Sequence, residues 1–521
     1  MTDQTIEGLQ AHYGPAYRWL ATATAITGTI ALALSSTMIN VAIPDVMGAF
    51  GIGQVQAQWL STGFLAAMTG FMLLNAWMVE NFGARATYIF AMALFVAGSI
   101  LGGFSPDIET LILGRVMQGA AAGLSQPLAM LIIFRVFPSE KRGAAMGIFA
   151  VGVVLAPAIG PTVGGMMIDS VNWRYVLFLV IPFCVLGSLM AAAFMPVRGR
   201  SGPRTGFDWI GFSLLFLALA TLLTGLSNGQ RVGWYSNQTY AYLGVALAGG
   251  AAFLAWELST RAPMLDLRLF TDRNFAAGSA VGFVFGAAIF GSFYLVPLFV
   301  QTVQGYSATR AGMVLMPGGF IMLLAFPIAG RLADRMNVFI PMAGGLLCFA
   351  WSSYLMTDVD LNTTFWMVAW WVLLSRLGLS FIMPGLTVGS LRTLPPDLLS
   401  QGAGAVNFVR QLGGAFGVNL LAVFLERRTA LYSDAFASAQ TPANPATAEM
   451  VRETVGALTQ AGAPETLRLP EAMFYLGRMI YTQASMIGFR DAFLAVAVVT
   501  SLAILPAYVL GRRGRTDATA V

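Results

Sequence analysis

The sequence has little charge. Asp, Glu, Lys and Arg make up 10% of its 521 residues, whereas soluble globular domains carry about 25%. Hydrophobic residues make up 57%, and the mean hydropathy is +0.72. A water-exposed surface of this composition would leave large apolar patches uncovered. The composition therefore excludes a soluble globular protein and predicts a chain that buries its apolar surface in lipid.

Reactive side chains are equally scarce. The one histidine, His12, lies in the N-terminal tail, the one lysine is Lys141, and the two cysteines, Cys184 and Cys348, lie within apolar runs. These residues assemble neither a Ser-His-Asp triad nor a Cys/His metal cluster, so we expect no enzyme, no metal site and no cofactor. The net charge of +5 comes from arginines spread between apolar runs, so we expect no nucleic-acid partner.

Long apolar runs fill most of the chain. A helix that spans a membrane needs about 20 mostly apolar residues. Windows of that length predict about fourteen spans, at 19–43, 58–78, 86–104, 110–134, 143–168, 175–195, 209–227, 240–258, 275–302, 311–332, 339–356, 365–391, 402–425 and 492–510. The polar, mildly acidic residues 1–17 lack the features of a cleavable signal, so we expect the first span to direct insertion.

Arginine placement predicts the orientation. The loops on one side hold most arginines, including Arg85 and Arg135, whereas the short loops on the other hold little beyond Arg174, Arg231 and Arg310. Basic loops stay in the cytoplasm, so we expect both termini there. The long polar segment 426–490 then lies outside. It contains two potential helices, interpreted either as packed over the loop or lying on the membrane surface, or as a docking surface for an outer partner.

Short sequence features recur in the same order in the two halves. Arg115 in LILGRVMQG, followed by Pro127, corresponds to Arg376 in LLSRLG, followed by Pro384. Span n of the first half thus matches span n+8 of the second. We expect two six-helix bundles, 1–200 and 263–521, separated by two inserted helices at 201–262, with an outer loop at 426–490. Such parallel repeats are typical of transporters whose halves rock about a central cavity.

Five segments in this order resemble the major facilitator superfamily, specifically its fourteen-span drug:proton antiporter branch of the EmrB/QacA type. They are SSTMINVAIP (35–44), LILGRVMQGAAAG (111–123), LAPAIGPTVGG (155–165), YLVPLFVQTVQGYSATRAGMVLMPGG (294–319) and NFVRQLGGAFG (407–417). The resemblance implies a major facilitator fold in the cell inner membrane. The long outer loop is similar to the EmrB subgroup, which implies a periplasmic membrane-fusion adaptor and an outer-membrane channel as partners, besides membrane lipid and a small amphipathic substrate.

The resemblance also implies roles for the polar and small residues of these segments. A mid-span charge costs roughly 2.5–3.5 kcal/mol to insert, so Arg115 must face the protein interior; its role is either proton coupling or a structural bond to carbonyls. Gly160, Pro161 and Gly164 belong to the antiporter motif, where small residues permit a tight helix crossing. The other residues expected to couple or gate transport are Gln118, Asp45, Glu80, Asp334 and Arg335, the last three as a cytoplasmic latch.

The expected substrate cavity combines polar and aromatic side chains of both halves. We assign to it Ser35, Asn40, Gln126, Tyr294, Phe299, Phe381, Asn407, Arg410 and Gln411.

One departure from the branch matters most. The first span usually carries an Asp where this chain has Ser35, and we find no convincing carboxylate in the centre of any span. We therefore expect a secondary multidrug or amphiphile exporter, proton-coupled and working by alternating access. The alternatives are an exporter of a neutral or anionic metabolite with atypical coupling, and a non-transporting sensor or scaffold.

Overall fold

The computed structural model describes residues 5–137, 156–157, 159–197, 206–260, 263–395, 398–441 and 443–512. Within these residues the regular secondary structure is helical, without a strand. Thirteen of the described helices are long and apolar enough to cross a membrane. The expected span 143–168 lies largely outside the described residues, although 159–170 form a helix. The prediction of an all-α, multi-pass membrane protein is confirmed.

The helices before residue 260 follow the expected spans. They are α1 (Ile6–Tyr13), η1 (Gly14–Ala16), α2 (Tyr17–Phe50), α3 (Gln54–Ala57), α4 (Trp59–Phe82), α5 (Ala84–Gly103), α6 (Ile108–Val136), the helix at 159–170, α8 (Tyr175–Phe178), α9 (Ile181–Phe194), α10 (Trp209–Arg231) and α11 (Asn237–Ser259).

The second set begins after a short connection. It comprises η2 (Leu267–Thr271), α12 (Arg273–Thr302), α13 (Ala308–Arg335), α14 (Phe339–Leu355), η3 (Met356–Asp358), α15 (Phe365–Leu391), α16 (Leu399–Ala439), α17 (Pro445–Gln460), α18 (Glu465–Leu502) and α19 (Ile504–Arg512).

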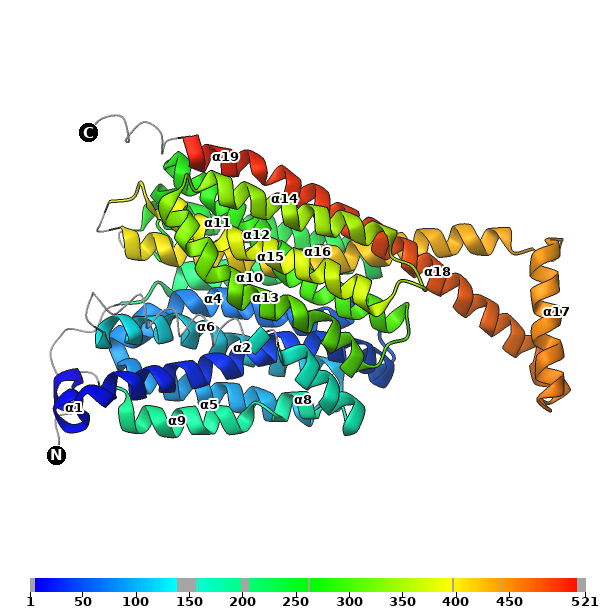
Figure 1. The fold of residues 1–521 in the computed structure, drawn as a ribbon, viewed down its shortest axis with the longest axis horizontal. Coiled ribbons are helices and arrows are strands. Elements are labelled where there is room, and N and C mark those ends of the chain that lie inside the picture. Colours follow the sequence, from blue (N-terminus) through cyan, green and yellow to red (C-terminus); the bar gives the residue numbers. More distant parts are fainter. Residues whose placement is uncertain are drawn as a thin grey trace.

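The long helices run roughly side by side along one axis (Figure 1). The short helix α1 and the last helix α19 lie at one end of this bundle, called the inner end below. The helix α17 lies beyond the opposite end, the outer end. The inner end is the one that the arginine distribution assigns to the cytoplasm.

Several hydroxyl groups inside the spans are satisfied by their own helices. The hydroxyls of Thr24, Thr29 and Thr69 each donate to the carbonyl oxygen four residues earlier, at 2.8, 2.9 and 2.6 Å. Because lipid offers no hydrogen-bond partners, a polar group in a span must find one within the protein. Intrahelical bonds of this kind let the sequence place Ser and Thr in spans without a partner helix.

The two halves repeat one packing scheme. In the first half α6 packs against α2, α4 and α5, and in the second α15 packs against the repeat-related α12, α13 and α14. A Cβ added to Gly98 would lie 2.7 Å from the carbonyl oxygen of Gly114, and one added to Gly378 would lie 2.6 Å from that of Gly345. Glycine pairs at equivalent positions therefore bring equivalent helices into backbone contact.

The inserted helices lie at the seam between the halves. α10 contacts α4 of the first half and α16 of the second. The hydroxyl of Ser227 accepts hydrogen bonds from Gln58 Nε2 (3.1 Å) and from Asn419 Nδ2 (2.9 Å). This serine thereby links both halves to the inserted pair.

Both helices expected in the outer segment 426–490 are present, within α17 and α18, but the bounds of the flanking spans need correction. The expected span at 402–425 continues as α16 to Ala439, and the helix of the last span begins at Glu465 rather than at residue 492. The two helices extend beyond the bundle, and α17 stands across their tips (Figure 1). The segment is therefore a helical projection that stands clear of the bundle. A hydropathy reading ends a span where polar residues begin, but residues 426–439 include no Gly or Pro to end the helix.

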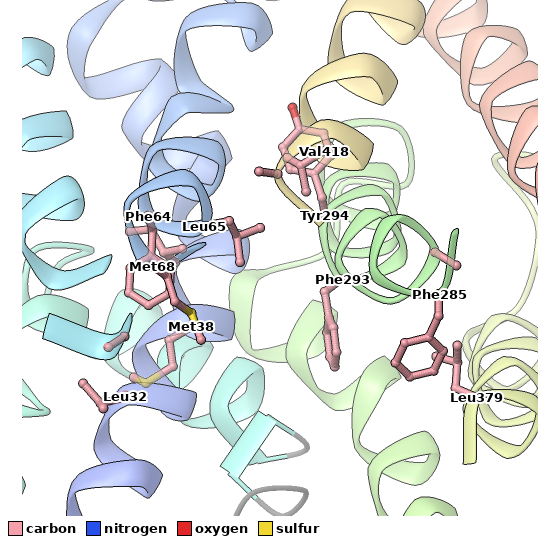
Figure 2. Packing of buried hydrophobic residues seen from close by; sticks show 14 of the residues in the cluster. Leu32, Met38, Phe64, Leu65, Met68, Phe285, Phe293, Tyr294, Leu379 and Val418 are labelled. Atoms are coloured by element: carbon pink, nitrogen blue, oxygen red, sulfur yellow. The ribbon is translucent and has the colours of Figure 1, made fainter. Parts of the chain in front are cut away.

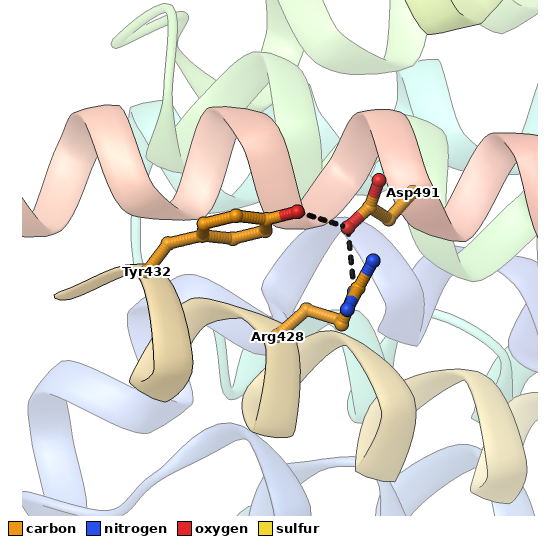
Figure 3. A network of polar contacts seen from close by, with 3 residues as sticks. All are labelled: Arg428, Tyr432 and Asp491. Atoms are coloured by element: carbon orange, nitrogen blue, oxygen red, sulfur yellow. Dashed lines mark hydrogen bonds and ion pairs between the residues drawn. The ribbon is translucent and has the colours of Figure 1, made fainter. Parts of the chain in front are cut away.

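An ion pair fastens the two arms of the projection where they leave the bundle. Arg428 Nε of α16 lies 2.6 Å from Asp491 Oδ2 of α18, and the Tyr432 hydroxyl donates to the same oxygen at 2.9 Å (Figure 3). The two charged side chains are 37% and 20% exposed. Partly exposed pairs contribute little stability singly, so this cluster chiefly sets the register of the arms.

Candidate transport cavity and outer seal

A cavity of about 160 Å³ lies between the two halves. Its described walls are mainly apolar, and Figure 2 shows several of the buried side chains that each half contributes to this region. The lining residues are Thr29, Leu32, Ala33, Ser36, Thr37, Phe64, Met68, Ala122, Gln126 and Pro157 from the first half, and Phe285, Ile289, Phe290, Phe293, Leu315, Gly319, Met322, Phe326, Arg376, Met383, Arg410 and Gln411 from the second. An apolar pocket with a few polar groups is typical of a small-molecule site.

Arg115 lies behind the cavity wall and is fully buried. Its Nε donates to the carbonyl oxygen of Leu60 (2.9 Å), and its Nη1 donates to Ser35 Oγ (3.0 Å) and Gln118 Oε1 (2.6 Å). The guanidinium carbon is 4.4 Å from the centre of the Phe64 ring, and that ring lines the cavity. The predicted burial and the predicted partner Gln118 are therefore confirmed. Arg115 joins α6 to α2 and α4.

Ser35 occupies the position at which the resemblance described above implies a carboxylate. Its side chain is 3% exposed and accepts a hydrogen bond from Arg115. A carboxylate at this position would form an ion pair with the arginine, whereas the serine provides a neutral acceptor. The charge of Arg115 is therefore held by neutral groups among the described residues.

Arg376 is the repeat counterpart of Arg115, but its surroundings differ. It is 1% exposed, its Nη1 donates to Ser292 Oγ (2.8 Å), and its guanidinium carbon lies 3.9 Å from the centre of the Phe293 ring. Unlike Arg115, Arg376 lines the cavity. Its residue type and position were apparent from the sequence, but its assignment to the cavity was missed.

Arg410, Gln411 and Gln126 are among the lining residues of this cavity; their role at a substrate stays a prediction. Arg410 Nη2 donates to the side-chain oxygen of Asn407, one turn earlier on α16. Gln411 Nε2 lies 3.5 Å from Gln126 Oε1 across the interface between the halves. This pair is therefore a polar contact between the two repeats at the level of the cavity.

Six residues assigned to the cavity do not line it. Ser35 contacts Arg115, Asn40 accepts a hydrogen bond from Ser61, and Asn407 supports Arg410. The remaining three are Tyr294, which is fully buried, Phe299, which packs on Phe489 and Phe493 of α18, and Phe381, whose Cβ lies on the side of α15 that contacts α14. Residue type and span number do not fix the direction in which a helix presents a side chain, and this is why these six residues are absent from the lining. Their assignment to the substrate site stays a prediction.

A tight helix crossing closes the outer end of the cavity region. A Cβ added to Gly165 would clash with the carbonyl oxygen of Ala308, and one added to Gly312 would clash with that of Pro161. Gly160 and Gly164 face α2. A Cβ added to Gly160 would lie 2.6 Å from Thr37 Oγ1, and one added to Gly164 would lie 3.1 Å from Met38 Cβ. The predicted close packing of the antiporter motif is therefore confirmed. The contact joins the first half to α13 of the second.

Two carboxylates reinforce this closure, and sequence reasoning missed both. Asp169 accepts hydrogen bonds from the backbone N–H groups of Ala308 (3.2 Å) and Thr309 (2.9 Å), in the first turn of α13. Glu426 Oε2 of α16 accepts one from the N–H of Val55 (2.9 Å) in α3, which leads into α4. Asp169 follows span 5 and caps the start of span 10, and Glu426 follows span 13 and caps the start of span 2. In the repeat, span 5 corresponds to span 13 and span 2 to span 10. Each half therefore caps an N-terminal turn of the other.

The hydrogen bonds at Asp169 favour its ionised form. Partial desolvation opposes ionisation, but the donors from Thr309, Ser307 and Ala308 together outweigh it and hold the pKa of Asp169 below its ordinary value. Asp45, the predicted coupling residue at the outer end of α2, is exposed and close enough for the two carboxylates to repel each other. Tyr294 is the titratable group of α12 that lies within electrostatic reach of Glu426.

The cavity lies on the inner side of this seal. On α12, the lining residues are 285–293, whereas Gln301, nearer the outer end, donates to the carbonyl oxygen of Val41 (3.1 Å). On α13, sealing residues 308–312 precede lining residues that begin at Leu315. Since α13 starts at the outer end, both helices place the seal outside the cavity.

The predicted cytoplasmic latch lies at the inner end. Glu80 is exposed near the end of α4, and Arg335 is exposed at the end of α13. The side chain of Asp334 lies outside the described part of the structure. The latch therefore stays a prediction.

The chain matches known proteins over most of its length. The sequence model of the Major Facilitator Superfamily matches residues 25–418. The multidrug export protein EmrB of Escherichia coli (strain K12) is 30% identical over 432 residues, which are 81% of this chain and 83% of that protein. The fatty acid resistance protein FarB of Neisseria gonorrhoeae is 28% identical over 471 residues, covering 89% and 90%.

A solved structure shares the fold. It is a bacterial homologue of the human lysosomal transporter Spinster, in an inward-facing and unoccupied conformation. The TM-score is 0.63 at 15% identity, and the match covers 96% of this chain and 98% of that one.

The glycine contact in the seal gives a first prediction. We expect Gly165→Ala to prevent full closure of the outer end and to reduce transport at least tenfold, because its Cβ would meet backbone that cannot move aside. The control is Gly244→Ala in α11, where an added Cβ meets nothing within 4 Å. Spin labels at Val171 and Leu361, exposed on the outer side of the two halves, would report the separation. An unchanged distance distribution for Gly165→Ala would contradict the role of this contact.

The seal carboxylates give a second prediction. Because the pKa of Asp169 is lower when the seal is closed than when it is open, closure is stabilised at neutral pH and weakens as the pH falls through the closed-state pKa. We expect the same spin-label pair to show outer opening below about pH 4. The variant Asp169→Asn should open more at neutral pH and respond less to acid, because it lacks the carboxylate whose pKa is lowered in the seal. A wild-type pH response retained in this variant would contradict the assignment.

Proposed function

Because the chain belongs to the major facilitator superfamily, we propose that it is a secondary active exporter of amphipathic small molecules. The observation that carries the proposal is the apolar cavity between the two repeat-related halves, on the inner side of a closed outer seal. In alternating access the halves rock about such a cavity and expose it to each side in turn. A substrate taken up from the cytoplasmic side leaves when the seal opens.

The outer seal is built to open and close. Its polar contacts are hydrogen bonds from carboxylates to backbone N–H groups and a side-chain amide to a carbonyl. None of these joins opposite side-chain charges, and all can be exchanged for water when the halves separate. The glycine contacts give shape complementarity without a covalent or metal link. The two halves can therefore separate at the seal and close again within each transport cycle.

We infer that the proton-motive force energises export. Arg115, with Ser35 and Gln118, links three helices that border the cavity, so a substrate-dependent movement of α2 or α4 reaches the arginine directly. The names of the relatives, a multidrug export protein and a fatty acid resistance protein, support export as the direction.

Transport by the purified protein tests the proposal. Reconstituted into liposomes, the chain should move an amphipathic fluorescent dye, and a protonophore should stop the movement. We expect Arg115→Ala to insert and fold but to lower the rate at least tenfold, because the link between α6, α2 and α4 is lost. Arg268→Ala, at an exposed arginine in η2, serves as the control. Dye binding without movement in the wild type would instead establish the sensor or scaffold alternative.

A second proposal concerns an outer partner. The projection of α16, α17 and α18 stands clear of the bundle (Figure 1), and α18 exposes apolar side chains there, including Leu469, Met473 and Phe474, at 57%, 51% and 76%. Exposed apolar patches of this kind mark interaction sites. We propose that the projection docks a periplasmic membrane-fusion adaptor, which would connect the exporter to an outer-membrane channel.

Single-residue variants test the docking proposal. We expect Phe474→Ser to reduce co-purification with the adaptor encoded beside this protein's gene at least fivefold, because buried aromatic side chains dominate binding at interfaces. The matched control is Tyr235→Ser, since Tyr235 is 89% exposed between α10 and α11, away from the projection. Equal recovery of the adaptor with both variants, or the lack of such an adaptor gene, would contradict the proposal.

A further inference from the structure

Two arginines bring positive charge into the cavity without a carboxylate to balance it. Arg376 and Arg410 are both among the lining residues, and no Asp or Glu is among those that the structure describes. A buried cation is normally paired, because lipid and apolar protein cannot replace its hydration. The cavity therefore holds a charge whose counter-ion has to come from somewhere else.

Both guanidinium groups keep unused hydrogen-bond donors. Arg376 donates to Ser292 and lies against the Phe293 ring, but its Nη2 is buried with no partner among the described residues. Arg410 donates to Asn407, and its buried Nε likewise lacks a described partner. Neutral partners leave the charge uncompensated, and a planar guanidinium with free N–H groups suits an oxyanion.

The comparison with Arg115 separates this feature from a merely structural one. Both arginines have a buried Nη2 with no partner among the described residues. Arg115 is nevertheless bound by a carbonyl, a hydroxyl and a side-chain amide, and it lies outside the lining set. The repeat-related Arg376 has a single hydroxyl partner and faces the cavity. The same residue at the same place in the fold is thus held by three protein groups away from the cavity in one half, and by one hydroxyl at the cavity wall in the other.

We propose, on the basis of the exporter function above, that the substrate is an anionic amphiphile. Its compact oxyanion head, a carboxylate, sulfonate or phosphate, binds at Arg376 and Arg410. Its apolar body lies against the side chains of Leu32, Phe64 and Met68 on the facing half. The anion supplies the counter-charge that the cavity lacks, and the apolar walls select the body.

The charge of such a substrate also explains how export runs without a first-span carboxylate. The cytoplasm is electrically negative, so an anion that leaves it moves down the membrane potential. One charge crossing about 100 mV is equivalent to a concentration ratio of about fiftyfold. Ser35 can then replace the carboxylate, because the electrical component of the proton-motive force acts on the substrate itself and no residue needs to carry a proton.

Binding to the purified protein tests the site. In nanodiscs of neutral phosphatidylcholine, decanesulfonate should bind at least tenfold more tightly than decanol or decyltrimethylammonium, as measured by competition with radiolabelled decanesulfonate. Arg376→Gln and Arg410→Gln should each weaken decanesulfonate at least tenfold and leave decanol within twofold. The control is Arg268→Gln, an exposed arginine in η2 that is not among the lining residues. Equal affinity of the wild type for the three probes would overturn the site.

A lipid headgroup has the same chemistry as a free amphiphile, and one further arm separates the two sources. In nanodiscs containing phosphatidylglycerol, a free amphiphile as the natural occupant predicts unchanged decanesulfonate affinity. If phosphatidylglycerol instead weakens decanesulfonate binding to the wild type while the weaker binding to Arg376→Gln stays the same, that result would assign the arginine site to an anionic lipid. If phosphatidylglycerol weakens decanesulfonate binding to both proteins, the lipid competes at another position, and the arginine site is overturned as the place of competition.

Flux measurements test the energetics separately. In liposomes with the pH equal on both sides, a potassium diffusion potential should drive radiolabelled decanesulfonate toward the positive side, and reversing the potential should reverse the direction. Transport that follows a pH gradient but ignores the potential would refute this inference while leaving the exporter function intact. Absence of any flux, with or without a gradient, would count against the exporter function itself.

Discussion

The crossing between the helix at 159–170 and the start of α13 is the contact on which the arrangement depends. Gly165 and Gly312 allow each backbone to reach a carbonyl of the other half, and a side chain at either position would hold the halves apart. With the outer ends in contact, Asp169 reaches the first N–H groups of α13 and Glu426 reaches α3. The position of the cavity follows, because the space between the halves can widen only on the inner side of the contact.

The internal repeat is a constraint that the protein uses and also breaks. Backbone packing keeps the symmetry, as the glycine pairs at 98 and 114 and at 345 and 378 show. Side-chain chemistry does not keep it. Arg115 is bound within the wall of the first half, whereas Arg376 opens onto the cavity with one hydroxyl partner. The two halves share their helix packing because each must pack a bundle of helices within lipid. A binding site, in contrast, needs only one set of polar groups.

The outer projection follows a different physical rule. Inside the membrane, apolar composition decides where a helix lies, because unpaired polar groups are costly there. Outside it, α16 and the first part of α18 continue as helices that stand clear of the bundle, and the Arg428, Tyr432 and Asp491 cluster joins them where they leave it (Figure 3). The projection is thus a direct continuation of two spans. Movement of the second half during transport would be carried into it without a flexible joint.

The sequence alone determined the properties that depend on composition and order along the chain. Low charge and long apolar runs require a helical membrane protein, the recurring segments indicate two related halves, and the burial of Arg115 follows from the cost of a charge within a span. The small residues of 155–165 also predicted a close crossing, because glycine permits it wherever the partner lies. These conclusions need no knowledge of which helices meet.

Only the tertiary structure decided which side chains share one space. Tyr294 and Phe299 have the chemistry of cavity residues but face other helices, whereas Arg376 faces the cavity. Asp169 and Glu426 resemble any polar residues at the ends of spans until the opposite helix N-terminus is placed beside them. A helix can present a residue in any direction around its axis, and the rotation of each helix is fixed by packing against neighbours distant in the chain. For that reason the sequence specified the helices and the structure specified the site.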